Sequence, residues 1–187
     1  MTTRAPARDR LLDAADELLF SEGVTSTPVD TVLSRAGVAP ATLYAHFGSK
    51  EGLVVEALRR RLARWDETWA AAVARADDDE GRLLAVFDAM ADFRGQSATA
   101  RWCAFLGTAA EHAHPSTELA DALSADTRLL RRRLRELAEP VAGDRAAEVA
   151  DQLVLVVTGT LATMLRQSPR TAMARGRAVA TALVSQA

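Results

Sequence analysis

Apolar residues recur along the start of the chain at the spacing of a half-buried helix. Over residues 7–22 they fall at positions 11, 14, 15, 18 and 19, the i, i+3, i+4, i+7, i+8 pattern that leaves one face buried. Gly23 follows, and glycine readily takes the backbone conformation that ends a helix. We therefore predict a first helix over residues 7–22.

A pair of short helices follows, separated by a glycine. Thr27 is expected to cap the first of them, with Asp30 completing a capping box. Gly37 is expected to end this helix. A third helix then opens at Pro40, a residue suited to the first helical turn, and ends at Gly48.

The rest of the chain keeps the helical period, interrupted by polar breaks. Ser49 is expected to cap a long fourth helix, and the acidic stretch 77–80 is interpreted as a solvated loop. The run 153–158 is rich in β-branched residues, but it lies inside a long periodic segment, so we predict helix there and not strand. The later predicted helices cover approximately residues 81–94, 99–113, 117–139, 144–166 and 169–185.

This series predicts an all-α protein of about nine helices. Alanine is abundant while glycine and proline are few, a composition that favours helix. We expect two domains. The first, residues 1–52, holds three helices and a helix-turn-helix, and the second, residues 53–187, is a larger helical domain.

Charge and cysteine content exclude several classes. With 23 Lys and Arg against 25 Asp and Glu, the net charge of −2 argues against nucleic-acid binding by bulk charge, although a local basic face remains open. Cys103 is the single cysteine, which excludes an intramolecular disulfide or a cysteine-based zinc site. No cofactor or metal is expected. Without a visible signal segment or a spanning apolar run, the expected location is the cytoplasm.

Residues 27–50 carry the most informative pattern. Two short helices joined by a tight glycine turn form a helix-turn-helix, whose second helix enters the major groove of DNA. The outward residues of that helix are Pro40, Ala41, Thr42, Tyr44, Ala45 and His46.

The residues themselves sharpen this interpretation. The stretch Thr42-Leu43-Tyr44-Ala45-His46-Phe47-Gly48-Ser49-Lys50-Glu51-Gly52-Leu53 resembles the recognition-helix signature of the tetracycline-repressor (TetR) family. The resemblance is dense over residues 8–55. It implies a homodimeric transcriptional regulator, and a repressor by preference, whose N-terminal domain binds palindromic operator DNA. It also implies that residues 53–187 dimerise and bind a small hydrophobic effector, and that the chain is not an enzyme.

The side chains of this stretch suit double-stranded DNA. Lys50, Tyr44 and His46 can reach phosphates, and Thr42 can contact a phosphate, a base edge or a thymine methyl group. The family often has polar residues where this helix has proline and alanine, so specificity is expected to use methyl contacts and DNA shape. The predicted DNA-binding residues are Thr27, Pro40, Ala41, Thr42, Tyr44, Ala45, His46 and Lys50.

The predicted second domain, residues 53–187, holds all three tryptophans. A stripe of aromatic residues can equally be part of the hydrophobic core or line a pocket. The TetR resemblance implies an effector pocket here, and a mostly apolar wall favours an apolar or aromatic effector. The candidate lining residues are Trp65, Trp69, Phe87, Met90, Trp102, Phe105 and His112.

The segment 146–165 is apolar on more than one face and is expected to be covered on two sides. Paired with the last helix around a two-fold axis, it would form a four-helix dimer interface. The alternative is that it is simply the central helix of its domain. The candidate interface residues are Val149, Leu153, Val156, Val157, Thr160, Leu161 and Met164.

Other features have plainer interpretations. The arginine runs 59–61 and 131–133 are expected to be solvated helix faces, and Cys103 to be core. His112 and His114 are two residues apart and would face away from each other on a helix, which argues against a metal site. Two rival functions stay open: a helical adaptor for protein partners and a helical enzyme, although no catalytic constellation is visible.

Overall fold

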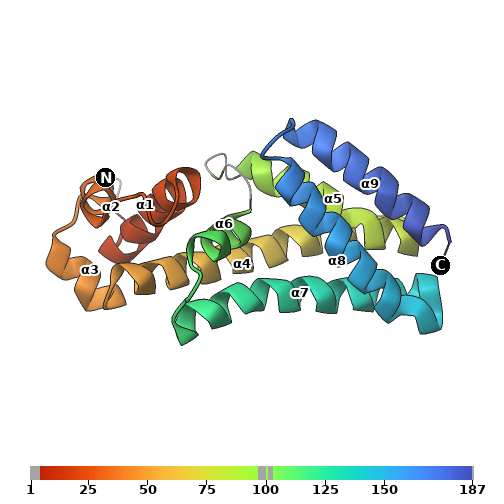
Figure 1. Cartoon of the computed structure of the whole chain (residues 1–187), viewed down its shortest axis with the longest axis horizontal. Helices are drawn as coiled ribbons and strands as arrows, with labels where there is room; N and C mark the ends of the chain where they lie inside the picture. Colours follow the sequence, from red (N-terminus) through yellow and green to blue (C-terminus); the bar gives the residue numbers. More distant parts are fainter. Residues whose placement is uncertain (1–4, 97–99, 101–102, 187) are drawn as a thin grey trace. The chain divides into compact units, whose positions relative to one another are not determined.

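The computed structural model describes residues 5–96, 100 and 103–186. In this part of the chain the regular structure consists of α-helices and one 3₁₀ turn, Gly143–Arg145 (Figure 1). The predicted all-α fold class is confirmed. The helices are α1 (Ala7–Glu22), α2 (Val29–Ala36), α3 (Pro40–Phe47), α4 (Lys50–Ala74), α5 (Asp79–Gln96), α6 (Ala104–Glu111), α7 (Thr117–Ala142), α8 (Ala146–Thr163) and α9 (Pro169–Val184).

The chain folds into two compact units, and α4 contributes to both. The first unit is Met1–Leu62 together with Thr99–Ser124, and the second is Ala63–Ala98 together with Ala125–Ala187. Helix α6 therefore belongs with the three N-terminal helices. The division of roles expected at residues 52 and 53 stays a prediction, because compactness does not say what each part binds.

The core of the first unit gathers leucines from α1, α3 and the start of α4. Leu11, Leu43, Leu53 and Leu58 have no exposed surface (0%) and belong to one buried cluster. Each such side chain contributes about 1.5–3 kcal/mol when it leaves water. This core gives α3 a fixed base, so that the opposite face of α3 remains outward.

Gly37 closes the turn between α2 and α3. Its φ of 62° lies in the left-handed region, which glycine enters without steric cost. The N–H of Gly37 donates to the carbonyl of Ser34 and that of Val38 to the carbonyl of Leu33, both at 3.2 Å. This is the hydrogen-bond pair that commonly ends a helix at a glycine. The tight turn predicted for the helix-turn-helix is confirmed.

In the second unit α8 packs along α9, and α9 along α5 (Figure 1). Its core includes Trp69, Leu83, Leu134 and Leu153, each with no exposed surface (0%). Helices α8 and α9 approach closely at Gly176, where a Cβ would lie 2.0 Å from Oγ1 of Thr160. A glycine is therefore needed at this contact.

Several helix ends differ from the prediction. Helix α5 begins at Asp79, inside the acidic stretch expected to be a loop, because carboxylates are favourable at the positive end of a helix. Helix α7 continues past Pro140 to Ala142, since one missing N–H near its end leaves most of its hydrogen bonds in place. Helix α6 covers Ala104–Glu111 of the predicted 99–113, of which residues 99, 101 and 102 lie outside the described ones.

Candidate nucleic-acid interface

Helix α3 presents most of the predicted DNA-binding residues to solvent. Tyr44 is 55% exposed, and Leu43 beside it is fully buried. Phe47 packs against the core of the first unit. The exposed residues of the helix are Pro40, Ala41, Tyr44, Ala45 and His46, while Thr42 is half-buried. The helix therefore has a buried side and an outward side, and the outward side carries the predicted residues except Thr42, which is half-buried.

Helix α1 fixes the turn that precedes α3. Nη1 of Arg10 donates to the carbonyl oxygens of Ala36, at 2.8 Å, and Gly37, at 3.1 Å. A cation is favourable at the carbonyl end of a helix, where backbone acceptors lack partners. Arg10 thus ties α1 to the end of α2 and sets where the recognition helix begins.

The prediction that Thr27 caps α2 is wrong. The helix begins at Val29 with Pro28 at the capping position and no side-chain cap. Thr27 is fully buried, and its Oγ1 donates to the carbonyl of Gly23 at 2.7 Å. The hydroxyl turns back toward the end of α1, because that carbonyl is a nearby acceptor. Thr27 therefore stabilises the α1–α2 loop, residues 23–28, with its side chain.

Lys50, the first residue of α4, also contacts this loop. Its Nζ donates to the carbonyl oxygens of Val24 at 2.5 Å and Thr27 at 2.6 Å. Burial lowers the pKa of Lys50 from its ordinary value, and the carboxylate of Glu111 opposes that shift. The ammonium is thus bound to two backbone carbonyls. The predicted contact between Lys50 and a DNA phosphate stays a prediction.

Sequence reasoning missed the environment of two acidic residues, one in each unit. Glu111 accepts the backbone N–H of Thr25 on Oε2 at 2.7 Å, across 86 positions of the chain. No local spacing signals such a contact. On α7, burial raises the pKa of Asp126 to about 6. The sequence does not indicate this burial, because acidic residues of an amphipathic helix are usually on its solvent-facing side.

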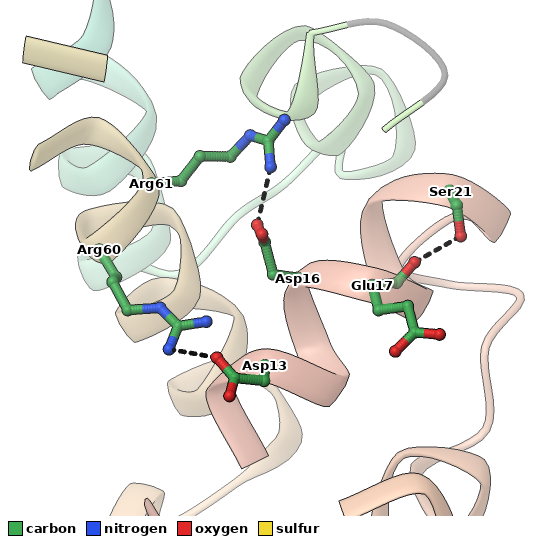
Figure 2. Close-up of polar contacts among 6 residues, drawn as sticks. All are labelled: Asp13, Asp16, Glu17, Ser21, Arg60 and Arg61. Atoms are coloured by element: carbon green, nitrogen blue, oxygen red, sulfur yellow. Dashed lines mark hydrogen bonds and ion pairs between the residues drawn. The ribbon is translucent and has the colours of Figure 1, made fainter. Parts of the chain in front are cut away.

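Ion pairs join α1 to the first half of α4 (Figure 2). Arg60 pairs with Asp13 at 2.9 Å, and Nη1 of Arg61 donates to Asp16 at 2.7 Å. Arg61 is 5% exposed and also lies over the ring of Phe20, 5.5 Å from its centroid. The prediction of a solvated arginine face is therefore wrong for Arg61, because a carboxylate on α1 lies within reach of its side chain.

The residues predicted to line an effector site fall in both units. In the second unit Trp69, Phe87 and Met90 are at most 4% exposed and belong to the core. The ring of Trp65 lies 5.6 Å from that of Trp69, and the guanidinium of Arg133 lies 5.4 Å from the Trp69 ring. Among the described residues, none accepts a hydrogen bond from the buried indole N–H of Trp69.

The remaining effector candidates belong elsewhere. Phe105 lies in the core of the first unit, and Nδ1 of His112 lies 2.8 Å from the carbonyl oxygen of Thr108. Cys103 packs partly buried against the same core. Trp102 lies outside the described residues. A single pocket that gathers these side chains stays a prediction.

Most of the predicted dimer residues serve the core of their own unit. Five are at most 6% exposed within the chain: Val149, Leu153, Val157, Thr160 and Met164. Val156 and Leu161 are half-buried. Helix α8 exposes other apolar residues, among them Leu155, which is 73% exposed. By length and composition alone the stretch 117–163 would also pass for a membrane span, as core helices of soluble proteins do.

Comparison with known proteins agrees with this architecture. Residues 11–57 match the family model described as "Bacterial regulatory proteins, tetR family". The chain is 33% identical over 90 residues to the HTH-type transcriptional activator FasR of Mycolicibacterium smegmatis, across 48% of this chain and 41% of that protein. It therefore spans less than half the length of that curated relative.

Solved structures match over nearly the whole chain. SCO4454, a TetR-family transcriptional regulator from Streptomyces coelicolor, has a TM-score of 0.88 and 26% identity, across 96% of this chain and 95% of that one. Residues 11–57 therefore match the TetR family, and the fold of the described residues is that of TetR-family regulators. A cysteine mutant of the TetR-family regulator CifR, solved with 26-bp operator DNA, has a TM-score of 0.79 and 23% identity, across 99% of this chain and 98% of that one. The TetR resemblance of residues 8–55 is thus confirmed.

Proposed function

We propose that this chain is a sequence-specific DNA-binding transcriptional regulator of the TetR family, a repressor, that acts in the cytoplasm. The outward face of α3 carries the proposal, because Tyr44 and His46 are exposed on a short helix whose other side is buried in the core. The family match over residues 11–57, which spans the helix-turn-helix, supports it. The operator complex of CifR supports the same mode of binding.

The outward face offers DNA few hydrogen-bonding groups. Tyr44 and His46 bind phosphates and so fix the position of the protein along the DNA. Thr42 reaches a base edge. Three apolar residues, Pro40, Ala41 and Ala45, contact thymine methyl groups and sense groove shape. Thr27, in the α1–α2 loop, and Lys50, which binds that loop from α4, support this face. The operator is then a pseudo-palindrome with half-sites about one helical turn apart or a multiple of it.

Replacing Tyr44 by alanine is expected to weaken operator binding about fivefold to tenfold, since the largest exposed side chain of α3 and its hydroxyl are lost. The probe is double-stranded DNA that the full chain selects from a random pool. Fluorescence anisotropy at several salt concentrations measures the affinity. A pool in which no sequence becomes enriched would count against a regulator and favour the adaptor alternative.

A pair of histidines provides the matched control for this experiment. His46 and His114 are both exposed, but only His46 lies on α3. His46→Ala is expected to weaken binding to the selected DNA, and His114→Ala to leave it unchanged. Equal effects of the two substitutions would place the DNA-binding face elsewhere.

The functional form is a homodimer that uses the exposed faces of α8 and α9. On α8 the residues Leu155, Gly159 and Ala162 are exposed, three and four positions apart, and none of them is charged. Val179 on α9 is 54% exposed. A second copy of the chain is the natural cover, because the small residues let helices approach closely and a two-fold axis matches a palindromic operator.

Leu155→Glu is expected to convert the dimer to a folded monomer, because a charge at the centre of an apolar interface loses its hydration without gaining a partner. Sedimentation velocity over a range of concentrations measures the change. Ala71→Glu, at an exposed position of α4, is the control and should remain dimeric. A Leu155→Glu protein that sediments as a dimer would move the interface away from α8.

The proposed effector is an apolar or aromatic molecule that binds beside Trp65 and Trp69. The unpartnered indole N–H of Trp69 supports this, because a hydrogen-bond acceptor on the effector would satisfy it. Helix α4 runs through both units, so it is the element by which the effector alters DNA binding. Titration of the operator complex with hydrophobic compounds should quench tryptophan fluorescence and release DNA together. Compounds that quench without releasing DNA would refute the coupling.

A further inference from the structure

The α1–α2 loop is held from two sides by side chains from distant parts of the chain. Lys50, the first residue of α4, donates Nζ to the carbonyls of Val24 at 2.5 Å and Thr27 at 2.6 Å. Glu111, the last residue of α6, accepts the N–H of Thr25 at 2.7 Å. All of these residues lie in the first unit. One loop of six residues is thus bound by a carboxylate at a backbone N–H and by an ammonium at two backbone carbonyls.

The ammonium of Lys50 is held in place by two carbonyls of this loop. It has three N–H donors, of which two are bound to carbonyls at short, charge-assisted distances. Thr27 is fully buried and Val24 is 5% exposed. Movement of Nζ to a phosphate would leave two carbonyls unpaired next to the core, which is unfavourable.

Glu111 is exposed, but its carboxylate lies close to the same loop. A Cβ added to Gly23 would lie 2.9 Å from Oε1 of Glu111, and Gly23 has a φ of 104°, where side chains are strained. The loop therefore has a backbone shape and a glycine that make room for this carboxylate. Lys50 and Glu111 also attract each other electrostatically, since the carboxylate favours the charged form of the lysine.

We propose that Lys50 and Glu111 form a clamp on the α1–α2 loop and are positioning residues for operator binding. They set where α2 begins and so where α3 is presented. This inference rests on the proposed function. It gives Lys50 a positioning role besides the phosphate contact expected for it, which its third N–H leaves possible, and it gives Glu111, an acidic residue, a favourable part in binding a polyanion.

The sign of the Glu111 effect separates the clamp from plain electrostatics. Removal of a negative charge near DNA favours binding if the charge has no structural part. The clamp predicts the opposite, because Thr25 loses its acceptor and the loop moves. Glu111→Ala is therefore expected to weaken binding to the selected operator about fivefold to tenfold, with unchanged affinity for random-sequence DNA. Glu111→Gln keeps an acceptor and should regain part of the affinity.

Glu22→Ala is the matched control. Glu22 is an exposed carboxylate at the end of α1, next to the same loop, and carries the same charge. The Glu22→Ala protein is expected to bind the operator as tightly as the wild type, or slightly more tightly. The proposal would be overturned if Glu111→Ala bound the operator as tightly as Glu22→Ala does.

The salt dependence of Lys50 variants gives a second, independent test. A phosphate contact predicts that Lys50→Met lowers the slope of log K against log salt by about 0.9 and weakens all DNA equally. The clamp adds a loss of affinity that is larger for the selected operator than for random-sequence DNA. Lys50→Arg, a variant that keeps the charge, retains affinity under a phosphate role alone but loses operator affinity under the clamp, because its longer side chain and planar guanidinium do not fit the place of the compact ammonium between the two carbonyls.

Amide hydrogen exchange tests the clamp without DNA. In Glu111→Ala, the amides of the α1–α2 loop, Thr25 above all, should exchange faster than in Glu22→Ala, with the melting temperature unchanged. Unchanged exchange would overturn the clamp. If the wild type selects no operator from the pool, the proposed function fails, and this measurement still decides whether the clamp exists.

Discussion

The N-terminal unit is expected to lose about 3–5 kcal/mol of stability when Asp16 is replaced by alanine. Asp16 accepts from Nη1 of Arg61 at 2.7 Å, and the two side chains are 13% and 6% exposed. Alanine removes this carboxylate from a guanidinium that is held in the interior beside Phe20. The loss is large because a buried cation cannot recover its hydration. Urea unfolding followed by circular dichroism measures it.

A neighbouring pair supplies the control. Asp13 lies one turn earlier on α1 and pairs with Arg60 at 2.9 Å, but its side chain is 68% exposed (Figure 2). Asp13→Ala is therefore expected to cost only about 0–1 kcal/mol. The double variant Asp16→Leu with Arg61→Met should regain most of the stability, since apolar residues of similar size replace a buried pair well. Equal losses from Asp13→Ala and Asp16→Ala would show that burial does not set the strength of these pairs.

Local signals predicted the helices and the recognition motif. The period of leucine and alanine over residues 7–22, the left-handed Gly37 and the proline that opens α3 each act within a few residues, so the sequence carries them directly. The outward residues of α3 follow from the same reasoning, because burial of Leu43 fixes the orientation of an eight-residue helix. Helix ends were less predictable, as α5 and α7 show.

Contacts between distant segments were not predictable. The sequence does not distinguish the three consecutive arginines at positions 59–61. Arg61 alone is buried, because it lies next to Asp16 of α1. The contacts of Lys50 with the α1–α2 loop were also missed, because nothing local shows that the carbonyls of this loop lie within its reach. The apolar residues of α8 showed a similar ambiguity. The sequence pattern indicates that several faces of the helix are apolar. Only the packing shows that Val157 is buried in the core of its own unit while Leu155 is exposed.

Gly52→Ala is expected to destabilise the first unit by about 2–3 kcal/mol and to weaken operator binding more than tenfold. Gly52 is the third residue of α4, and a Cβ there would lie 2.0 Å from the backbone carbonyl oxygen of Phe47, the last residue of α3. Helix propensity alone predicts a gain of about 1 kcal/mol for this substitution. The clash is with backbone, which cannot rotate away, so the cost of overpacking exceeds that gain and forces α3 and α4 apart.

Gly95→Ala isolates the propensity effect. Gly95 lies in α5, and a Cβ there would meet no atom within 4 Å. This control should be neutral or slightly more stable than the wild type, and its DNA affinity should be unchanged. Opposite signs for the two Gly→Ala substitutions in urea unfolding are the expected result. A Gly52→Ala protein as stable as Gly95→Ala, with full operator affinity, would mean that α3 can shift on α4 at little cost, and the recognition helix would then not be held at a fixed distance from the start of α4.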